Sequence, residues 1–318
     1  MSQTATVKSQ PATATRATYL LLSLVIIFWA ANWVVMKQAL AVMSPPLFFT
    51  MLRLVGAALA MLLVSLVIRE PLLPLAGERF MLAISGIFQI AGMLGFATAG
   101  LAHVGPGRAA VLVYTLPLWA LPCGWLLAHE RITTGGLVGG LVGFLGIALF
   151  VNPWLVDWRN PRALLGNALV MCAGLAWAIG ASVYRRRKWS TSFWTQTWWM
   201  VLWSAIVIAV IFVLSAPHPR FSTNAISIGS LAYNWFIGTA LCYWWWGKAL
   251  SVLPAARLGQ IVTLVPVLAF LMSAAVYGEH IGITVIGSMV LIILGIMITL
   301  RSKNVARPAD LDSAALEM

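Results

Sequence analysis

Long apolar runs alternate with short polar gaps along almost the whole chain. Charged residues, prolines and glycines divide the runs into ten segments, each near the roughly 20 residues that a helix needs to cross a bilayer. The segments cover residues 18–36, 46–68, 80–98, 109–128, 135–151, 164–183, 192–214, 228–247, 258–277 and 283–300. The pattern predicts an all-α integral membrane protein with ten transmembrane helices. Residues 1–17 and 302–318 are polar or small, and we expect them to form disordered tails.

Basic residues are distributed unevenly between the gaps. The chain is 61% hydrophobic and 9% charged, with a net charge of +12, which excludes an ordinary soluble domain. With the N-terminus inside, fourteen basic residues fall on the inner side and five on the outer side. The positive-inside rule then places both termini in the cytoplasm, with "RRRK" at 185–188 as the strongest anchor. We expect the lipid bilayer as a partner and no nucleic acid, because the basic residues are scattered through the gaps.

The second half of the chain repeats the first. With an offset of 149, "LLAHERI" at 126–132 aligns with "AVYGEHI" at 275–281, so that Glu130 meets Glu279. With an offset of 148, Trp29-Ala30 meets Trp177-Ala178. Each half holds five segments, and because five is odd, the second half enters the membrane from the opposite side. Inverted repeats of this kind are typical of secondary transporters, although a duplication kept only for fold stability stays open.

Two stretches carry a family resemblance. They are "FWAANWVVMKQALAVMSPPLFFTMLRL" at 28–54, and "GLAHVGPGRAAVLVYTLPLWALPCGWLLAHERI" at 100–132 with its later partner ending "YGEHI". Both resemble EamA-type members of the drug/metabolite transporter superfamily. The resemblance implies two inverted five-helix repeats, at 18–152 and 153–301, and export of amino acids or other small metabolites. It also implies that helices 1–4 and 6–9 enclose a central path, with helices 5 and 10 at the periphery.

Glycines and prolines inside the segments predict two local features. Gly135, Gly139 and Gly143 have the spacing of a close-packing helix face, which we favour over a phosphate-binding loop. Pro117 and Pro266 lie inside the fourth and ninth segments. Because proline supplies no backbone N–H, we expect weakened backbone hydrogen bonding just before each of them.

Polar and aromatic side chains inside the apolar segments predict a substrate cavity. Trp29, Asn32, Trp33 and Met36 lie on one stripe of the first helix, and Trp177 is the repeat partner of Trp29. The other candidates share a face with a glycine or precede a proline, and they are Gln89, Tyr114, Gln260 and Thr263. Together these residues predict aromatic walls with neutral hydrogen-bonding groups. For each of them, a contact between helices is the alternative role.

Arg53 is the only charge that lies clearly inside a predicted segment. It is about seven residues, or ~10 Å, from the outer end of the second helix. A charge at this depth binds a substrate carboxylate or lines a water-filled path. The alternative is a side chain that extends to the outer interface. We favour the functional role, because the family pattern also carries an arginine here.

Glu130 and Glu279 are too far apart to act as a catalytic pair. In the predicted topology a hydrocarbon core of ~30 Å separates them, whereas paired acid/base carboxylates work within about 10 Å. We expect local partners instead: Arg131 or an inner-loop arginine for Glu130, and His280 or an outer-loop arginine for Glu279. Two roles stay open, a gate that opens and closes during transport and a simple helix end.

The sequence favours a secondary exporter of a small, amino-acid-like metabolite in the bacterial inner membrane. A multidrug or other metabolite carrier on the same scaffold is the alternative. An intramembrane enzyme is disfavoured, because no HExxH, HxxxxD or GxSxG pattern is present. Cys123, Cys172 and Cys242 lie in apolar runs without ligand spacing, so we expect no metal and no cofactor. Proton coupling, facilitated movement of the substrate, and homodimer formation stay open.

Overall fold

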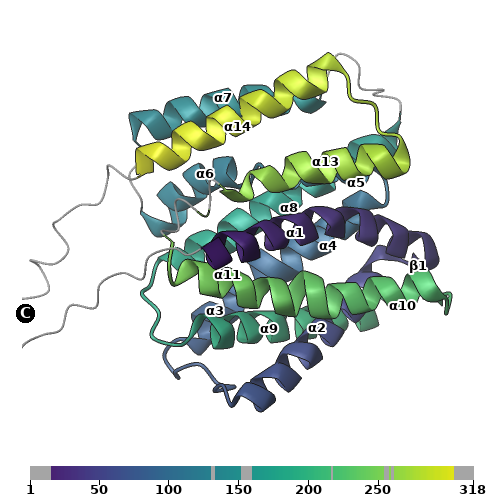
Figure 1. Cartoon of the computed structure of the whole chain (residues 1–318), viewed down its shortest axis with the longest axis vertical. Helices are drawn as coiled ribbons and strands as arrows, with labels where there is room; N and C mark the ends of the chain where they lie inside the picture. The colour runs from purple at the N-terminus through teal and green to yellow at the C-terminus, as the bar shows by residue number, and fades with distance from the viewer. Residues whose placement is uncertain are drawn as a thin grey trace, which may run out of the picture.

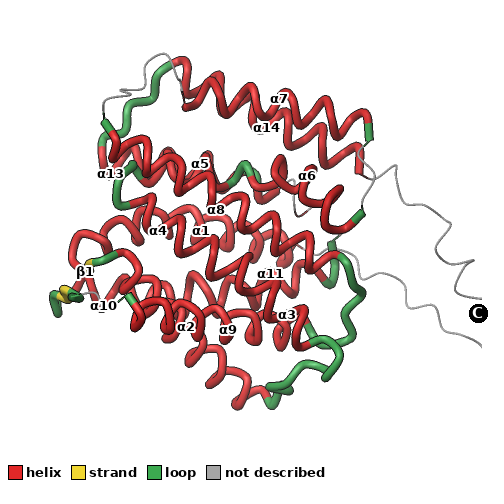
Figure 2. The backbone as a smooth tube through the Cα atoms, turned by 180° about the vertical axis from the view of Figure 1, so that it is seen from behind, coloured by secondary structure: helices red, strands yellow, loops and turns green. Residues whose placement is uncertain are grey.

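The apolar segments form helices that run side by side, and both described ends of the chain lie at the same face (Figures 1 and 2). The computed structural model describes residues 16–129, 133–151, 160–215, 218–253, 258 and 261–303. Its elements are α1 Arg16–Val42, β1 Met43–Ser44, α2 Pro46–Ile68, α3 Arg79–Gly86, η1 Ile87–Gly92, α4 Met93–Leu101, α5 Pro106–Val113, α6 Leu116–Ala128, α7 Thr134–Val151, α8 Pro161–Arg185, α9 Phe193–Leu214, β2 Arg220–Phe221, α10 Ala225–Ala232, η2 Tyr233–Leu241, α11 Cys242–Leu250, α13 Leu264–Tyr277 and α14 Ile283–Lys303.

Seven helical segments in the described part of the chain are long and apolar enough to cross a membrane. They are Arg16–Val42, Pro46–Ile68, Arg79–Leu101, Pro106–Leu127, Pro161–Arg185, Phe193–Leu214 and Ala225–Leu250. Three shorter apolar helices cover Thr134–Phe150, Leu264–Tyr277 and Ile283–Thr299. The protein is therefore a mostly helical multi-pass membrane protein. The count of ten spans and the cytoplasmic position of the termini stay predictions.

Prolines and small polar residues mark the starts of several helices. Prolines occupy the first turn, where a missing N–H breaks no helical hydrogen bond, in α2 (Pro46), α5 (Pro106) and α8 (Pro161). Asn160 caps α8 by accepting a hydrogen bond from the N–H of Ala163 at 3.2 Å, and Ser192 caps α9 in the same way. The local sequence thus determines where α2, α5, α8 and α9 begin, and these helices form part of the cavity wall.

Two spans contain a π-helical segment at equivalent places in the two halves. η1 covers Ile87–Gly92, and with the offset of 148 this range maps onto 235–240, inside η2. The sequence pattern predicted uninterrupted helices here, because a π segment changes backbone pairing without changing the run of apolar residues. Such segments often occur at functional sites, and both of these border the cavity described below.

A break between α5 and α6 interrupts the fourth predicted segment. Val113 ends α5, Tyr114 and Thr115 form a turn, and Leu116 begins α6. The hydroxyl of Thr115 donates to the carbonyl oxygen of Leu112 at 2.6 Å. Pro117 follows Leu116 and supplies no backbone N–H, so one hydrogen bond of the helical ladder is missing at this point. The predicted weakening of the backbone before Pro117 is therefore seen as a broken helix.

A short two-stranded sheet corrects the all-α prediction. β1 pairs antiparallel with β2, with Met43 opposite Phe221 and Ser44 opposite Arg220. The backbone N–H of Ser222 also donates to the carbonyl oxygen of Val42 at 3.2 Å. A strand of two residues carries no alternation that a sequence pattern can reveal. The pairing joins the connection between α1 and α2 to the connection between α9 and α10.

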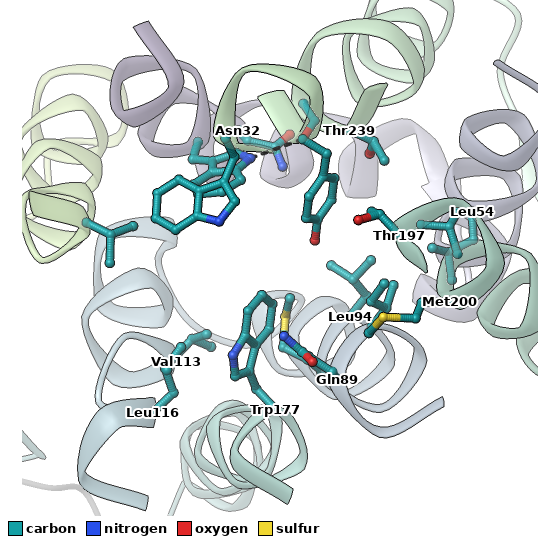
Figure 3. Close-up of a pocket in the computed structure, with 18 of the residues that line it drawn as sticks. Asn32, Leu54, Gln89, Leu94, Val113, Leu116, Trp177, Thr197, Met200 and Thr239 are labelled. Atoms are coloured by element: carbon teal, nitrogen blue, oxygen red, sulfur yellow. Dashed lines mark hydrogen bonds between the residues drawn. The ribbon is translucent and has the colours of Figure 1, made fainter. Parts of the chain in front are cut away.

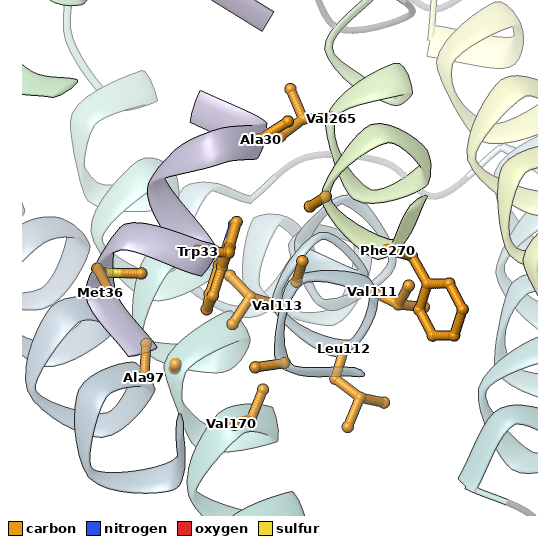
Figure 4. Packing of buried hydrophobic residues seen from close by; sticks show 14 of the residues in the cluster. Ala30, Trp33, Met36, Ala97, Val111, Leu112, Val113, Val170, Val265 and Phe270 are labelled. Atoms are coloured by element: carbon orange, nitrogen blue, oxygen red, sulfur yellow. The ribbon is translucent and has the colours of Figure 1, made fainter. Parts of the chain in front are cut away.

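Buried apolar side chains form two main clusters in the described residues. The first joins α1, α5 and α13 with parts of α4, α7, α8 and α14 (Figure 4). The second joins α2, α3, η1, the start of α4 and α9. Since lipid tails are as apolar as leucine, close van der Waals packing holds these clusters together in a membrane. The cavity lies between them.

Glycines allow α7 and α14 to approach closely. A Cβ on Gly139 would lie 2.7 Å from the carbonyl oxygen of Gly295, and a Cβ on Gly146 would lie 2.7 Å from the backbone nitrogen of Ile292. These contacts leave no space for a side chain. The predicted close-packing face is therefore confirmed at Gly139 and at Gly143, whose backbone lies against Gly295, and α7 and α14 form one layer at the edge of the molecule (Figure 1).

Candidate functional site

A cavity of about 510 Å³ lies between helices from the two halves of the chain (Figure 3). The first half contributes α1, α2, η1, α4, α5 and α6, and the second half contributes α8, α9, η2, α11 and residues 262–263. Most of the lining side chains are apolar or aromatic. The volume falls within the roughly 300–1,000 Å³ that is usual for small-molecule sites.

Most of the residues that the sequence selected come together at this cavity. Lining positions are held by Trp29, Asn32, Trp33, Arg53, Gln89, Tyr114, Trp177 and Thr263. Gln260 lies outside the described residues. Figure 3 shows Asn32 and Thr239 on one wall and Gln89 and Trp177 on the opposite wall. The structure thus gathers into one space side chains that are more than 200 residues apart in the chain. Their binding roles stay predictions.

An aromatic group forms the wall where α1 faces η2 and α11. The ring of Trp29 lies 5.3 Å from that of Trp246 and 6.0 Å from that of Tyr243, measured between centroids. The indole N–H of Trp29 donates to the carbonyl oxygen of Gly238 at 3.2 Å. Because Gly238 belongs to the π segment η2, this contact fixes the Trp29 ring against the second half of the chain.

Arg53 is buried in α2, with 6% of its surface exposed, and lines the cavity. Its Nη1 contacts the Sδ of Met36 at 2.7 Å, and its Nε has no hydrogen-bond partner in the structure. A thioether is only a weak acceptor. Among the described residues that line the cavity there is no Asp or Glu. The alternative in which Arg53 extends to the membrane interface is therefore wrong, because its side chain stays inside the protein.

Two neutral carboxamides also lack partners at the cavity. The Oδ1 of Asn32 and the Oε1 of Gln89 are buried without a hydrogen bond. Gln89 is held close to α8, because a Cβ on Gly180 would lie 2.5 Å from its backbone nitrogen. Asn32 lies beside η2, where a Cβ on Gly238 would be 3.5 Å from its Oδ1. Buried polar atoms normally have partners, and both residues line the cavity, so these two carboxamides are candidates for contact with a ligand.

Several lining residues were not predicted from the sequence: Tyr184, Gln196, Thr197, Thr239, Tyr243 and Trp246. The repeat contained a signal for Tyr184. Six repeat-related pairs line the cavity from both halves, namely Trp29/Trp177, Met36/Tyr184, Arg53/Val201 and Ile90/Gly238 at an offset of 148, and Val113/Val262 and Tyr114/Thr263 at an offset of 149. Projecting Met36 of the predicted α1 stripe onto its repeat partner would have found Tyr184.

In the described part of the chain, the cavity lining reaches the ends of helices at one face. We call the face where α8 ends and α9 begins the basic face, because the exposed residues 185–188 lie there. Tyr184, Phe193 and Leu250 line the cavity at helix ends on this face. Leu101, the repeat partner of Leu250, is fully buried at the opposite face. The repeat-related walls are therefore similar at mid-depth and different at the two ends.

At the opposite face, Glu279 connects a helix of the first half to a helix of the second half. Its Oε1 accepts hydrogen bonds from the backbone N–H of Gly107 at 3.1 Å and from the hydroxyl of Ser273 at 2.5 Å. The carboxylate therefore caps the start of α5, where a negative charge is favourable. Its charge also acts on Lys37 and Arg108. These four residues and Glu279, which we call the Glu279 cluster, do not line the cavity.

The expected partners of Glu279 are correct only in part. Arg108 lies near it, as expected of an outer-loop arginine, but the hydrogen bonds of Glu279 come from Gly107 and Ser273, while His280 is exposed. The sequence could not reveal Gly107, because the donor is a backbone N–H. Glu130 and Arg131 lie outside the described residues. No group of His, Cys, Asp or Glu within the described ranges has the arrangement of a metal site.

Comparisons with known proteins agree with this architecture. A Salmonella typhimurium (strain LT2) protein named probable amino-acid metabolite efflux pump is 27% identical over 296 residues, covering 90% of this chain and 95% of its own. An Escherichia coli (strain K12) protein of the same name is 26% identical over 287 residues, with 86% and 92% covered. A Bacillus subtilis (strain 168) protein named uncharacterized transporter YoaV is 25% identical over 273 residues, with 86% and 92% covered.

A solved crystal structure shares the fold, with a TM-score of 0.62 over 92% of this chain and 100% of its own at 17% identity. The family model described as the EamA-like transporter family matches residues 16–152 and again 164–301. The two matches cover most of the chain and correspond to its two halves. The chain therefore belongs to the EamA-like transporter family.

Proposed function

We propose that this transporter exports a small, amino-acid-like metabolite across the bacterial inner membrane by alternating access. The observation that carries the proposal is the cavity, because both halves of the chain supply its walls at repeat-related positions. A site at the interface of two repeats is where secondary transporters bind their substrates. Two relatives named amino-acid metabolite efflux pumps support the substrate class and the direction of movement.

The difference between the two ends of the cavity supports the alternating mechanism. With the predicted topology the basic face is cytoplasmic, so the cavity extends toward the cytoplasm while the Glu279 cluster joins α5 to the α13–α14 connection at the outer face. This arrangement corresponds to an inward-facing state, ready to take up a substrate for export. In an inverted repeat, exchanging the conformations of the two halves gives the outward-facing state.

Export is tested in a bacterial strain that overproduces the protein. The cells are challenged with toxic amino-acid analogues, and amino acids in the medium are measured. We expect increased resistance to at least one analogue and increased excretion of the matching amino acid. A second arm uses purified protein in proteoliposomes and measures release of radiolabelled substrate with and without a pH gradient, which separates proton coupling from facilitated movement. Unchanged resistance and excretion for every amino acid would contradict the proposal.

A multidrug carrier is the second candidate, and the aromatic group around Trp29 is the observation that favours it. Three aromatic rings this close together accept many flat, lipophilic molecules. The same resistance experiment with lipophilic cations distinguishes the two functions. Resistance to such cations without amino-acid excretion would favour the multidrug carrier.

A further inference from the structure

Among the described residues that line the cavity, Arg53 is the one positive charge, and none of them supplies a carboxylate counterion. Arg53 has only 6% of its surface exposed, and its Nε lacks a partner. Leaving a buried charge unpaired costs free energy, and charges inside membrane proteins usually pair or face a functional pathway. An anionic group on a ligand would satisfy this guanidinium through charge-assisted hydrogen bonds.

The positive charge is present in one half of the chain only. Arg53 and Val201 occupy repeat-related positions, and both line the cavity. The repeat therefore does not explain the arginine as a shared feature of the scaffold. Arg53 places a charge on the α2 side of the cavity, whereas the equivalent position on α9 is the apolar Val201. A ligand with one anionic group would bind in a single orientation.

Asn32 places an unpaired acceptor close to this charge. Met36, which contacts the Nη1 of Arg53, lies four residues after Asn32 on α1. Residues four apart on a helix share a face, with Cβ atoms roughly 5–6 Å apart. The free Oδ1 of Asn32 is therefore about one helical turn from the guanidinium contact. An α-amino acid carries an ammonium group one carbon away from its carboxylate, and this matches the pair of side chains.

We infer that Arg53 and Asn32 form the site for the head group of a neutral α-amino acid, with Arg53 binding the carboxylate and the Oδ1 of Asn32 accepting from the ammonium group. This inference rests on the proposed function and specifies its substrate class. The remaining lining is mostly apolar or aromatic, with Gln89 on the opposite wall (Figure 3) and neutral polar side chains at Gln196, Thr197, Thr239 and Thr263. The cavity therefore favours apolar or aromatic side chains, and it disfavours cationic side chains because the one charge among its described lining residues is positive.

The test compares a complete amino acid with analogues that lack one charged group. The probes are L-phenylalanine, phenethylamine without the carboxylate, and 3-phenylpropionate without the ammonium group, together with the corresponding series from L-leucine. Binding to purified full-length protein in detergent is measured by calorimetry. We expect loss of the carboxylate to weaken binding roughly ten- to a hundred-fold, as for a hydrogen bond to a buried charge. L-Lysine should bind more weakly than L-leucine.

Variants of Arg53 and Asn32 show which side chain binds which group of the ligand. Arg53→Gln should weaken the binding of L-phenylalanine and 3-phenylpropionate but leave the binding of phenethylamine unchanged. Arg53→Lys should restore part of the lost affinity. Asn32→Leu should weaken the binding of L-phenylalanine and phenethylamine but leave the binding of 3-phenylpropionate unchanged. Gln89→Leu removes a carboxamide from the opposite wall and should change all three affinities by a similar factor. Exposed Arg220→Gln is the control for loss of charge. A single size-exclusion peak shows that each variant is folded.

The outcomes separate this inference from the proposed function. Amino-acid export combined with equal binding of L-phenylalanine and phenethylamine would overturn the head-group site and leave the exporter intact. Equal effects of Arg53→Gln on all three probes would do the same. If no amino acid is bound or transported, the proposed function fails and the head-group site fails with it.

Discussion

At the scale of single residues, Glu78 connects two loops at the basic face. It precedes α3, is almost fully buried, and accepts hydrogen bonds from the N–H of Ser190 at 2.8 Å and from the N–H and hydroxyl of Thr191 at 3.2 and 2.5 Å. These hydrogen bonds, first the one from the Thr191 hydroxyl and then the one from Ser190, lower the pKa of the Glu78 carboxyl below its ordinary value, and the positive charge of Arg187 acts in the same direction. One carboxylate therefore holds the α2–α3 and α8–α9 connections together.

Glu78→Gln should lower the thermal unfolding midpoint at neutral pH, because the amide cannot match the charge-assisted hydrogen bonds. Since the folded-state pKa is lowered, the stabilisation from Glu78 is fully present above the ordinary value of 4.5 and is lost as the pH falls through the folded-state pKa. The difference in thermal unfolding midpoint between the wild type and the variant should therefore become smaller as the pH is lowered. Unfolding is measured in detergent between pH 7 and pH 4, with exposed Arg186→Gln as the control. A difference that stays constant over this range would contradict the assignment.

At the scale of elements, the contact between α7 and α14 depends on backbone meeting backbone. At Gly295 the nearest atoms to an added Cβ would be the nitrogen and Cα of Gly143 and the carbonyl oxygen of Gly139, at 2.4 to 2.6 Å. Backbone atoms cannot move aside as a flexible side chain can. Even a methyl group would push the two helices apart along their length.

Gly295→Ala should therefore destabilise the protein by about 1–3 kcal/mol, the usual cost of overpacking. Gly229→Ala is the matched control, because a Cβ there meets no atom within 4 Å and the residue lies in the helix α10. Alanine favours a helix over glycine by about 1 kcal/mol, so this control should be neutral or slightly stabilising. The thermal unfolding midpoints of Gly295→Ala and Gly229→Ala, measured in detergent and compared with that of the wild type, test this prediction. Equal effects of the two substitutions would show that close approach of α7 and α14 is not required.

The helices were predictable from the sequence because their length and apolar character are set by the membrane. The predicted segment 46–68 matches α2 residue for residue. The strand pair and the π segments were not predictable, since they depend on backbone hydrogen bonds to distant parts of the chain. In the cavity, Asn32 and Arg53 were found because polar groups are unusual in an apolar run. Tyr243 and Trp246 were not, because neighbouring tryptophans gave no sign of which ring faces inward.

At the scale of the whole molecule, Glu279 joins the two halves at the face that the described cavity lining does not reach. The carboxylate follows α13 in the second half and caps α5 in the first half. On α1, the Nζ of Lys37 donates to the carbonyl oxygens of Leu101 and Val104 at 2.6 and 2.9 Å, which holds the end of α4 beside the same cluster. Opening this face requires both sets of contacts to separate.

Glu279→Ala should shift the protein toward the state in which this face is open. Repeat-related Leu101→Cys and Leu250→Cys report on the two ends, in a background where the exposed Cys172 is replaced by serine. We expect the alkylation rate to rise several-fold at position 101 and to fall at position 250, because one conformational change alters both ends in opposite directions. Exposed His280→Ala is the control. Unchanged rates at both cysteines would show that Glu279 only ends a helix.

The strand pair has a consequence for the route that a substrate takes. β1 and β2 fasten the neighbouring ends of α2 and α9 at the face opposite the basic one, and Glu78 fastens their other ends through the adjoining loops. Because α2 and α9 are held together at both ends, we expect them to keep their relative position during transport and to form a stationary frame. We expect the moving part to be the group of α1, α5 and α13, which pack together in the first buried cluster. We expect the exit to form where α5 separates from Glu279, on the far side of the cavity from the frame.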